Sequence, residues 1–212
     1  MLKAFQDLLI NRFSFLKKPP LLLAVSGGLD SMVLTDLCLK SGLNIALAHC
    51  NFKLRNQESD GDEDFIKNFA QTNHLEVFTT HFETESFATT TKQSIQMAAR
   101  QLRYEWFETL KNQHGFEYIL TAHHADDNLE TALINLSRGT GLEGLTGIPE
   151  LNGFIVRPLL KFSREDIHDF ATFHNLSWRE DSSNISTKYV RNNLQHTIIP
   201  LLKNLNPSFI ES

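Results

Sequence analysis

Short runs of consecutive apolar residues alternate along the chain with longer stretches in which apolar residues recur at helical spacing. The clearest runs cover residues 21–25 and 44–48, and further strands are predicted at 75–80 and 118–122. Continuous apolar runs of this length, bounded by glycine or polar residues, are typical of strands that are buried on both faces. An order in which strands alternate with helices predicts an α/β fold, a doubly wound parallel sheet with helices on both faces.

Apolar residues at a period of 3.6 predict the helices between these strands. The first helix runs from about Met32 to Leu39 and ends at Gly42, the second covers 59–73 and the third covers 94–111. The inward-facing positions are Phe65, Ile66 and Phe69 in the second helix, Ile95, Ala99, Leu102, Trp106 and Leu110 in the third, and Leu129, Ala132, Leu133 and Leu136 in a fourth.

The sequence beyond Arg138 differs from the part before it. Several glycines lie within a short stretch there, a composition that is typical of loops. A further strand is expected at 154–156, a helix capped by Ser163, and a last helix that begins after Asn184 and continues past Ile198. Pro200 marks a break or kink in that helix. We expect residues 1–19 to form an N-terminal helix and lead-in, and residues 20–212 to form one domain with a helical C-terminal end.

Composition agrees with one well-buried globular domain and narrows its class. The chain has 212 residues, of which 41% are hydrophobic and 21% are charged, and it lacks an apolar run long enough to span a bilayer. Cys38 and Cys50 lie far apart and form no Cys-x-x-Cys pattern, so a cytoplasmic setting is expected. The net charge of −5 disfavours a freestanding nucleic-acid binder but leaves room for local basic patches.

Polar motifs follow three of the predicted strands at the point where each strand ends. They cover residues 26–31, 49–55 and 123–127. The ligand of an open parallel sheet lies beyond the carboxyl ends of its strands. We therefore expect the three motifs to converge on one edge of the sheet, although about 100 residues separate the first from the last.

The first of these motifs has the chemistry of a phosphate-binding loop. Its residues are Ser26, Gly27, Gly28, Leu29, Asp30 and Ser31. Glycines allow close approach of the backbone, and a helix N-terminus presents N–H groups to an anion. A carboxylate such as Asp30 fits beside a phosphate when Mg²⁺ bridges the two. The alternative is a simple turn in which Asp30 and Ser31 cap a helix, and the motif is neither a Walker A loop nor a dinucleotide fingerprint.

The motif at 26–31 resembles the PP-loop of the N-type ATP pyrophosphatases. Further segments resemble one family within that group, the tRNA(Ile)-lysidine synthetases. These segments are 49–55 with Glu58 and Ser59, 98–104, 121–131 and 138–145, with weaker matches at 157–160, 180–184 and 191–192. The resemblance covers roughly residues 20–200, and the His-His-x-Asp-Asp and Arg-Gly-Thr-Gly segments are its most specific parts.

The resemblance implies an ATP-dependent ligase with Mg²⁺ as cofactor. In this family ATP activates O2 of the wobble cytidine of an isoleucine tRNA, free lysine attacks C2, and AMP and pyrophosphate are released. The implied catalytic residues are Asp30, Arg100 and Asp127, and the implied metal ligand is Asp30. Residues 26–31, His49 and His124 would bind ATP. Arg55, Arg103, Arg138 and Arg191 would contact tRNA, together with further C-terminal tRNA-binding domains that the family usually carries.

Simpler interpretations stand beside each of these roles. Asp126 and Asp127 would also stabilise a helix N-terminus, and with His123 and His124 they could be taken for a zinc site, although the ligand spacing is irregular. His49 could be structural, the arginines could be solvated, and Trp106 and Trp178 fit a core.

Alternative functions remain open as well. One is tRNA thiolation, which the missing Cys-x-x-Cys pairs disfavour. Others are small-molecule amidation and a non-catalytic nucleotide- or RNA-binding module.

Overall fold

A six-stranded sheet forms the centre of the computed structural model, which describes all residues except 56, 142–143, 145, 181–193 and 207–212. The strands run in the order β3-β2-β1-β4-β6-β5, and all neighbours are parallel except β5 and β6. The α/β fold with a parallel sheet is therefore confirmed, with one antiparallel strand at its edge. The strands are β1 (Leu21–Ala24), β2 (Ile45–Asn51), β3 (Val77–His81), β4 (Tyr118–Leu120), β5 (Leu151–Asn152) and β6 (Ile155–Val156).

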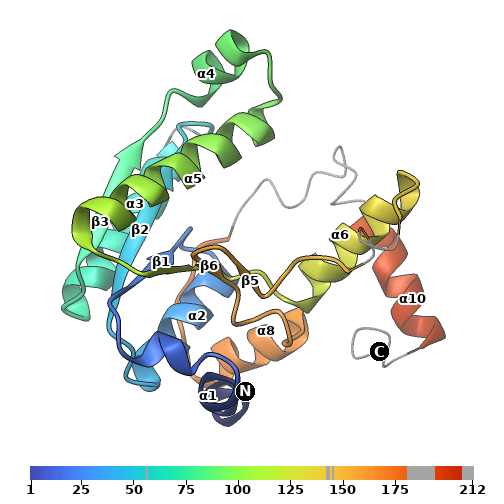
Figure 1. Ribbon diagram of the computed structural model, residues 1–212, viewed down its shortest axis with the longest axis horizontal. Coiled ribbons are helices and arrows are strands. Elements are labelled where there is room, and N and C mark those ends of the chain that lie inside the picture. The colour runs from blue at the N-terminus through green and yellow to red at the C-terminus, as the bar shows by residue number, and fades with distance from the viewer. Residues whose placement is uncertain (56, 142–143, 145, 181–193, 207–212) are drawn as a thin grey trace.

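Successive residues of the central strands point into two different cores, as the two-residue period of a strand requires. Leu21 and Leu23 of β1 belong to one buried cluster, and Leu22 belongs to the other. The first cluster is covered by α1 (Leu2–Asn11), α2 (Leu29–Lys40), α3 (Gln57–Thr72) and α8 (Arg164–Phe173). The second is covered by α5 (Ile95–His114), which lies on the opposite face of the sheet (Figure 1).

The N-terminal segment packs into the same core as the sheet. Phe5 and Leu9 of α1 are buried, and so is Leu16 of the short 3₁₀ helix η1 (Ser14–Lys17). Phe15 adds an aromatic contact, because its ring centroid lies 4.8 Å from that of Tyr118 on β4. The lead-in therefore covers one face of the sheet and does not stand apart from it.

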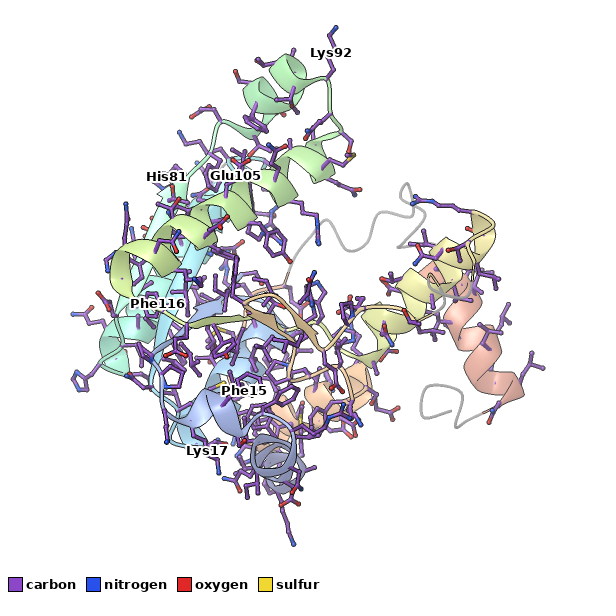
Figure 2. All side chains as sticks on the ribbon, viewed as in Figure 1. Phe15, Lys17, His81, Lys92, Glu105 and Phe116 are labelled. Carbon is purple, nitrogen blue, oxygen red and sulfur yellow. The ribbon has the colours of Figure 1, made fainter. Side chains whose placement is uncertain are left out.

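Several elements differ from the sequence expectation. Helix α4 (Thr84–Thr91) was not anticipated; it stacks against α5, with Lys92 at the tip between them (Figure 2). In α5 the buried residues are Ala98, Phe107 and Leu110, so the expected stripe is confirmed at Leu110, while its first member, Ile95, is 43% exposed. Trp106, another expected position, is partly buried and packs against the second core cluster.

Helix α6 (Ala125–Ser137) forms where a fourth helix was expected, but its apolar stripe is not part of either core cluster among the described residues. Leu136 is 57% exposed. The helix lies to one side of the sheet, next to the π-helical turn η3 (Leu194–Ile198) and α10 (Ile199–Leu205) (Figure 1). Pro200 stands in the first turn of α10, where its missing N–H costs least. The expected start of the last helix lies outside the described residues.

Within the described part of the chain, every helix falls short of the length and apolar character that crossing a bilayer requires.

Candidate functional site

Hydrogen bonds that involve two serines hold the loop between β1 and α2 in its conformation. The Ser26 backbone N–H donates to Ser31 Oγ at 3.3 Å, and Ser31 Oγ donates to the Gly28 carbonyl at 2.9 Å. Gly27 has a φ of +85°, a conformation that favours glycine. The N-cap of α2 is Gly28, so no side chain caps the helix there, and its first N–H groups face the loop. This arrangement is suited to binding an anion.

The loop lies at the point where the strand order reverses. The chain proceeds from β1 to β2 and β3 on one side, and later returns to place β4 on the other side of β1. A crevice between the ends of two such strands is the usual ligand site of an open α/β sheet. The polar motifs after β1, β2 and β4 accordingly meet around one cavity, as the sequence predicts.

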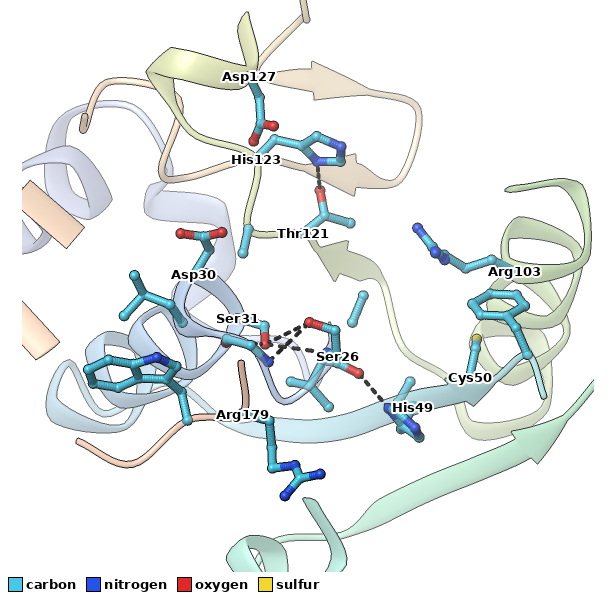
Figure 3. A pocket seen from close by; sticks show the side chains of 18 of the residues that line it. Ser26, Asp30, Ser31, His49, Cys50, Arg103, Thr121, His123, Asp127 and Arg179 are labelled. Atoms are coloured by element: carbon cyan, nitrogen blue, oxygen red, sulfur yellow. Dashed lines mark hydrogen bonds between the residues drawn. The ribbon is translucent and has the colours of Figure 1, made fainter. Parts of the chain in front are cut away.

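The cavity has a volume of about 500 Å³, within the usual range for a small-molecule site. Of the residues assigned to it from the sequence, the lining includes Ser26, Gly28, Leu29, Asp30, Ser31, His49, Arg55, Arg103 and Asp127. Figure 3 shows Asp30 and Asp127 approaching from one side of the cavity and Arg103 from the opposite side, with the loop between them.

A buried histidine connects the acidic residues on one side of this cavity. His124 Nε2 lies 3.8 Å from Asp30 Oδ2 and 3.6 Å from Asp127 Oδ2, and its Nδ1 lies 3.8 Å from Asp126 Oδ2. His124 stands behind these carboxylates and does not line the cavity, whereas its neighbour His123 does. The His124 imidazole therefore lies between the carboxylates of Asp30, Asp126 and Asp127.

Asp30 and His124 each have one buried polar atom that lacks a hydrogen-bond partner among the described residues, Oδ1 in Asp30 and Nδ1 in His124. Burial raises the pKa of the Asp30 carboxyl above its ordinary value, the charge of His124 opposes that rise, and Asp127 adds to it. A bound cation would relieve this cost. Among the described residues, however, no three His, Cys, Asp or Glu side chains could hold a metal ion by themselves, so such an ion would need ligands from a substrate.

Asp126 and Asp127 also have structural tasks. Asp127 Oδ2 accepts a hydrogen bond of 3.0 Å from the His124 backbone N–H and so caps the start of α6. Asp126 Oδ2 accepts one of 2.8 Å from the backbone N–H of Arg164, the first residue of α8. The helix-capping interpretation therefore holds for Asp127, which nevertheless remains open to the cavity with 25% of its side chain exposed.

His49 combines a structural contact with a position on the cavity wall. Its Nδ1 donates to the Val25 carbonyl at 2.9 Å, which leaves the buried Nε2 without a hydrogen-bond partner among the described residues. Burial lowers the pKa of His49, so the neutral ring is favoured at pH 7.

The arginines proposed from the sequence occupy different places. Arg55 and Arg103 line the cavity, and the Arg103 guanidinium lies 5.1 Å from the centre of the Phe52 ring. Arg100 lies one helical turn earlier on α5, outside the lining, with its guanidinium 4.7 Å from the Tyr104 ring. Arg138 is exposed at the end of α6, and Arg191 lies outside the described residues.

Several lining residues were not assigned to the site from the sequence. Trp178 was expected in the core; it does pack against one cluster, but it also lines the cavity, and its Nε1 donates to Glu180 Oε1 at 2.8 Å. The resemblance at 180–184 was the one sequence feature that pointed to this region. Further lining residues that lie outside the three predicted motifs and were not assigned to the site are Tyr104, Phe107, Arg164, His168 and Arg179, whereas Phe52 and His123 belong to motifs that were expected to converge there.

Sheet, loop and cavity together define an α/β protein with an anion-binding loop at its switch point. The chain belongs to the PP-loop domain family, whose model, an ATP-binding PP-loop domain, matches residues 2–202.

Two curated relatives of this chain share the same name. A tRNA(Ile)-lysidine synthase of Parabacteroides distasonis is 44% identical over 202 residues, which are 95% of this chain and 46% of that protein. A tRNA(Ile)-lysidine synthase of Porphyromonas gingivalis is 45% identical over 192 residues, which are 90% of this chain and 42% of that protein. The chain therefore spans about half the length of these relatives.

Solved structures support the fold at low sequence identity. A U34-tRNA thiolase from Methanococcus maripaludis, solved with its 4Fe–4S cluster, has a TM-score of 0.79 at 17% identity and covers 100% of this chain and 75% of its own. An NMN synthetase from Francisella tularensis has a TM-score of 0.60 at 12% identity, with coverages of 99% and 94%.

Proposed function

We propose that this chain is the catalytic part of an ATP-dependent ligase that joins free lysine to C2 of the wobble cytidine of tRNA(Ile). The observation that carries the proposal is the single cavity in which the PP-loop faces Asp127 and Arg103. The name shared by relatives at 44% and 45% identity supports the choice of substrates.

The first step needs an anion site for the leaving group. O2 of the cytosine ring attacks the α-phosphorus of ATP, the bond to the β-phosphate breaks, and pyrophosphate leaves. The uncapped N-terminus of α2 and the hydroxyls of Ser26 and Ser31 suit the pyrophosphate. Arg103 suits the negative charge that spreads over the phosphates, and because it lines the cavity it fits this role better than Arg100.

The second step needs a base for the lysine side chain. The ε-ammonium group must lose a proton before its nitrogen attacks C2, and AMP then leaves with the former O2 of the base. Asp127 is partly exposed in the cavity and can hold the ammonium group or take its proton.

Mg²⁺ fits the same cavity through Asp30. The buried, unpartnered Oδ1 of this carboxylate is a site where a cation would compensate a desolvated charge. A bound magnesium ion supplies charge neutralisation on the phosphates, which would provide its remaining oxygen ligands.

Recognition of tRNA is the part of the proposal that extends beyond the cavity. The basic residues that we assign to the tRNA backbone are Arg55, which lines the cavity, Arg138, which lies outside its lining, and Arg191, together with further C-terminal domains. We also propose that the protein works in the cytoplasm, because both cysteines are free thiols.

The number and the environment of the cysteines disfavour tRNA thiolation as the function of this chain. The chain has two cysteines, Cys38 buried in the core and Cys50 at the cavity, too few to hold an iron–sulfur cluster. Burial raises the pKa of Cys50 to about 12, so its thiolate is disfavoured as a nucleophile.

Asp127→Asn separates the two steps. An asparagine oxygen can still accept from the His124 N–H, so the cap of α6 is retained, but the base is lost. We expect ATP affinity within about twofold of the parent and a fall in lysine transfer of at least about 100-fold. Isothermal titration with ATP and incorporation of labelled lysine into tRNA(Ile), assayed in the full-length protein, measure the two quantities.

Asp127→Ala is the matched control, because it removes both the base and the cap and should also lower the melting temperature. Equal loss of ATP binding in Asp127→Asn would assign Asp127 to the nucleotide instead. Product formation that is independent of lysine, or of tRNA, would overturn the proposed function.

A further inference from the structure

The segment that follows α8 crosses directly over the phosphate-binding loop. The backbone N–H of Arg179 donates to the Gly27 carbonyl at 2.9 Å, a contact that joins positions far apart in the sequence. The Arg179 side chain then continues along the loop, since a Cβ on Gly27 would lie 3.7 Å from Arg179 Cγ. Figure 3 shows Arg179 beside the loop, on the side opposite to Asp127.

Asp62 on α3 anchors the far end of this side chain. Arg179 Nε donates to Asp62 Oδ1 at 3.0 Å, and Arg55 Nη2 donates to Asp62 Oδ2 at 2.8 Å. The Asp62 side chain is only 8% exposed. One buried carboxylate therefore holds two arginines of the cavity wall, and a charge so far desolvated is stabilised only by such partners.

A glycine inside α3 makes room for the guanidinium. Gly61 occupies the second turn of the helix, where glycine is a poor helix former. A Cβ at this position would lie 3.1 Å from Arg179 Nη2, so the guanidinium rests on the helix backbone. Close packing of Arg179 is thus a physical reason for a glycine at a position that would otherwise favour alanine.

From these contacts we infer that Arg179 is a positioning residue, which with Asp62 and Gly61 holds the PP-loop against α3 in the conformation that binds the phosphates of ATP. The backbone hydrogen bond fixes Gly27, and the ion pair fixes the segment that makes this bond. The inference rests on the proposed function for the identity of the ligand, but the loop contacts themselves are independent of it.

Gly61→Ala tests the inference because its effects on folding and on the loop have opposite signs. Alanine strengthens the helix, so the melting temperature should stay equal or rise. The added methyl would lie 3.1 Å from Arg179 Nη2, so the guanidinium must shift by a few tenths of an ångström, and the dissociation constant for Mg-ATP should rise about two- to threefold. Asp64→Ala is the matched control: it changes an exposed residue of the same helix, also favours helix formation, and should leave ATP binding unchanged.

Asp62→Asn and Asp64→Asn form a second pair. Asp62→Asn should weaken ATP binding at least as much as Arg179→Gln, because Asp62 also holds Arg55. Adding Arg179→Gln to Asp62→Asn should weaken binding little further, since Arg179 acts through its contact with Asp62. Asp64→Asn should bind ATP like the parent.

Hydrogen exchange of the amides in 26–31, measured without nucleotide, separates this inference from the proposed function. Arg179→Gln should speed exchange there about tenfold, Gly61→Ala should speed it to a smaller degree, and both should leave the central strand β1 unchanged. Unchanged exchange in the loop, or ATP binding equal to the parent, overturns the positioning role. Faster exchange in a chain whose parent form binds no ATP supports the positioning role and overturns the proposed function.

Discussion

Asp30 has a partly buried carboxylate whose charge is unfavourable for folding, although the same charge would be useful in the candidate site. It begins a helix at a cavity wall, with one carboxylate oxygen buried and unpartnered among the described residues. Asp127 and Asp126 lie near enough to disfavour its ionisation further. A charge held in this way is destabilising, and in the proposed function a bound cation would relieve that cost.

Asp30→Asn should therefore stabilise the ligand-free chain. Burial raises the pKa of Asp30 above its ordinary 3.8, so the folded state binds the proton more tightly than the unfolded state does, and stability is lost as the pH rises from 3.8 through the raised pKa. The variant should melt at a higher temperature than the parent at pH 7.5 and show a smaller difference at pH 3.5.

Thermal unfolding at the two pH values measures this effect. Pyrophosphate release by the full-length protein should fall at least about 100-fold in the same variant. A lower melting temperature at pH 7.5 would contradict the account of Asp30.

Helix α3 is fastened to the sheet by polar contacts as well as by its apolar face. Glu63 Oε2 accepts from His81 Nε2 on β3 at 2.6 Å and from Asn51 Nδ2 on β2 at 3.1 Å, and its Oε1 pairs with Lys67 at 2.6 Å. The Glu63 side chain is only 6% exposed, whereas His81 stands at the outer end of β3 (Figure 2). The Glu63 carboxylate therefore links helix α3 to strands β2 and β3 by hydrogen bonds.

Glu63→Gln should destabilise the fold by about 2 kcal/mol at pH 7, since an amide leaves some of these donors without an acceptor. Burial alone would raise the pKa of Glu63, but hydrogen bonds from Lys67, Asn51 and His81 lower it to about 2 from 4.5. The stabilisation is thus complete above pH 4.5 and is lost as the pH falls towards 2.

Urea unfolding between pH 2 and 7 measures the difference. The parent should lose more stability than Glu63→Gln across that window, and Asp64→Asn should behave like the parent. Equal acid sensitivity of the parent and Glu63→Gln would show that Glu63 is not held by these contacts.

Other elements show where sequence patterns reach their limit. The sequence predicted β1, β2, β3 and β4 to within a few residues. The apolar runs of β1 and β2 are buried in the sheet, as such runs favour, whereas β3 lies at the edge of the sheet and its residues are partly buried or exposed. Helix α4 was missed, since its threonine-rich sequence lacks an apolar stripe. The predicted stripe of α5 is right at Leu110 but wrong at Ile95, which is exposed, because contacts with the sheet that the sequence alone does not show decide which residues are buried.

At the scale of the whole molecule, the distribution of charge bears on tRNA binding. The net charge is −5, so phosphate contacts must come from local arginines. Arg138 is exposed at the end of α6, away from the cavity lining. It can contribute to tRNA binding without contributing to ATP binding.

Arg138→Gln should reduce the slope of log K for tRNA against log salt concentration by about 1, and leave the affinity for ATP unchanged. Filter binding with labelled tRNA at several salt concentrations, performed on the full-length protein, measures the slope. Lys3→Gln, an exposed change on α1, is the control and should leave the slope unaltered. A slope equal to that of the parent would remove Arg138 from the tRNA contact surface.

The sequence by itself determined the alternation of the first four strands with helices, the position of the loop at 26–31 and the meeting of three motifs at one sheet edge. These follow from local patterns and from the general geometry of parallel sheets. Only the tertiary structure decided that Arg103 and not Arg100 lines the cavity, and that Asp62 holds Arg179 against the loop. The physical reason is that a side chain's direction and its distant partners depend on how the helices pack, and packing is a property of the folded chain as a whole.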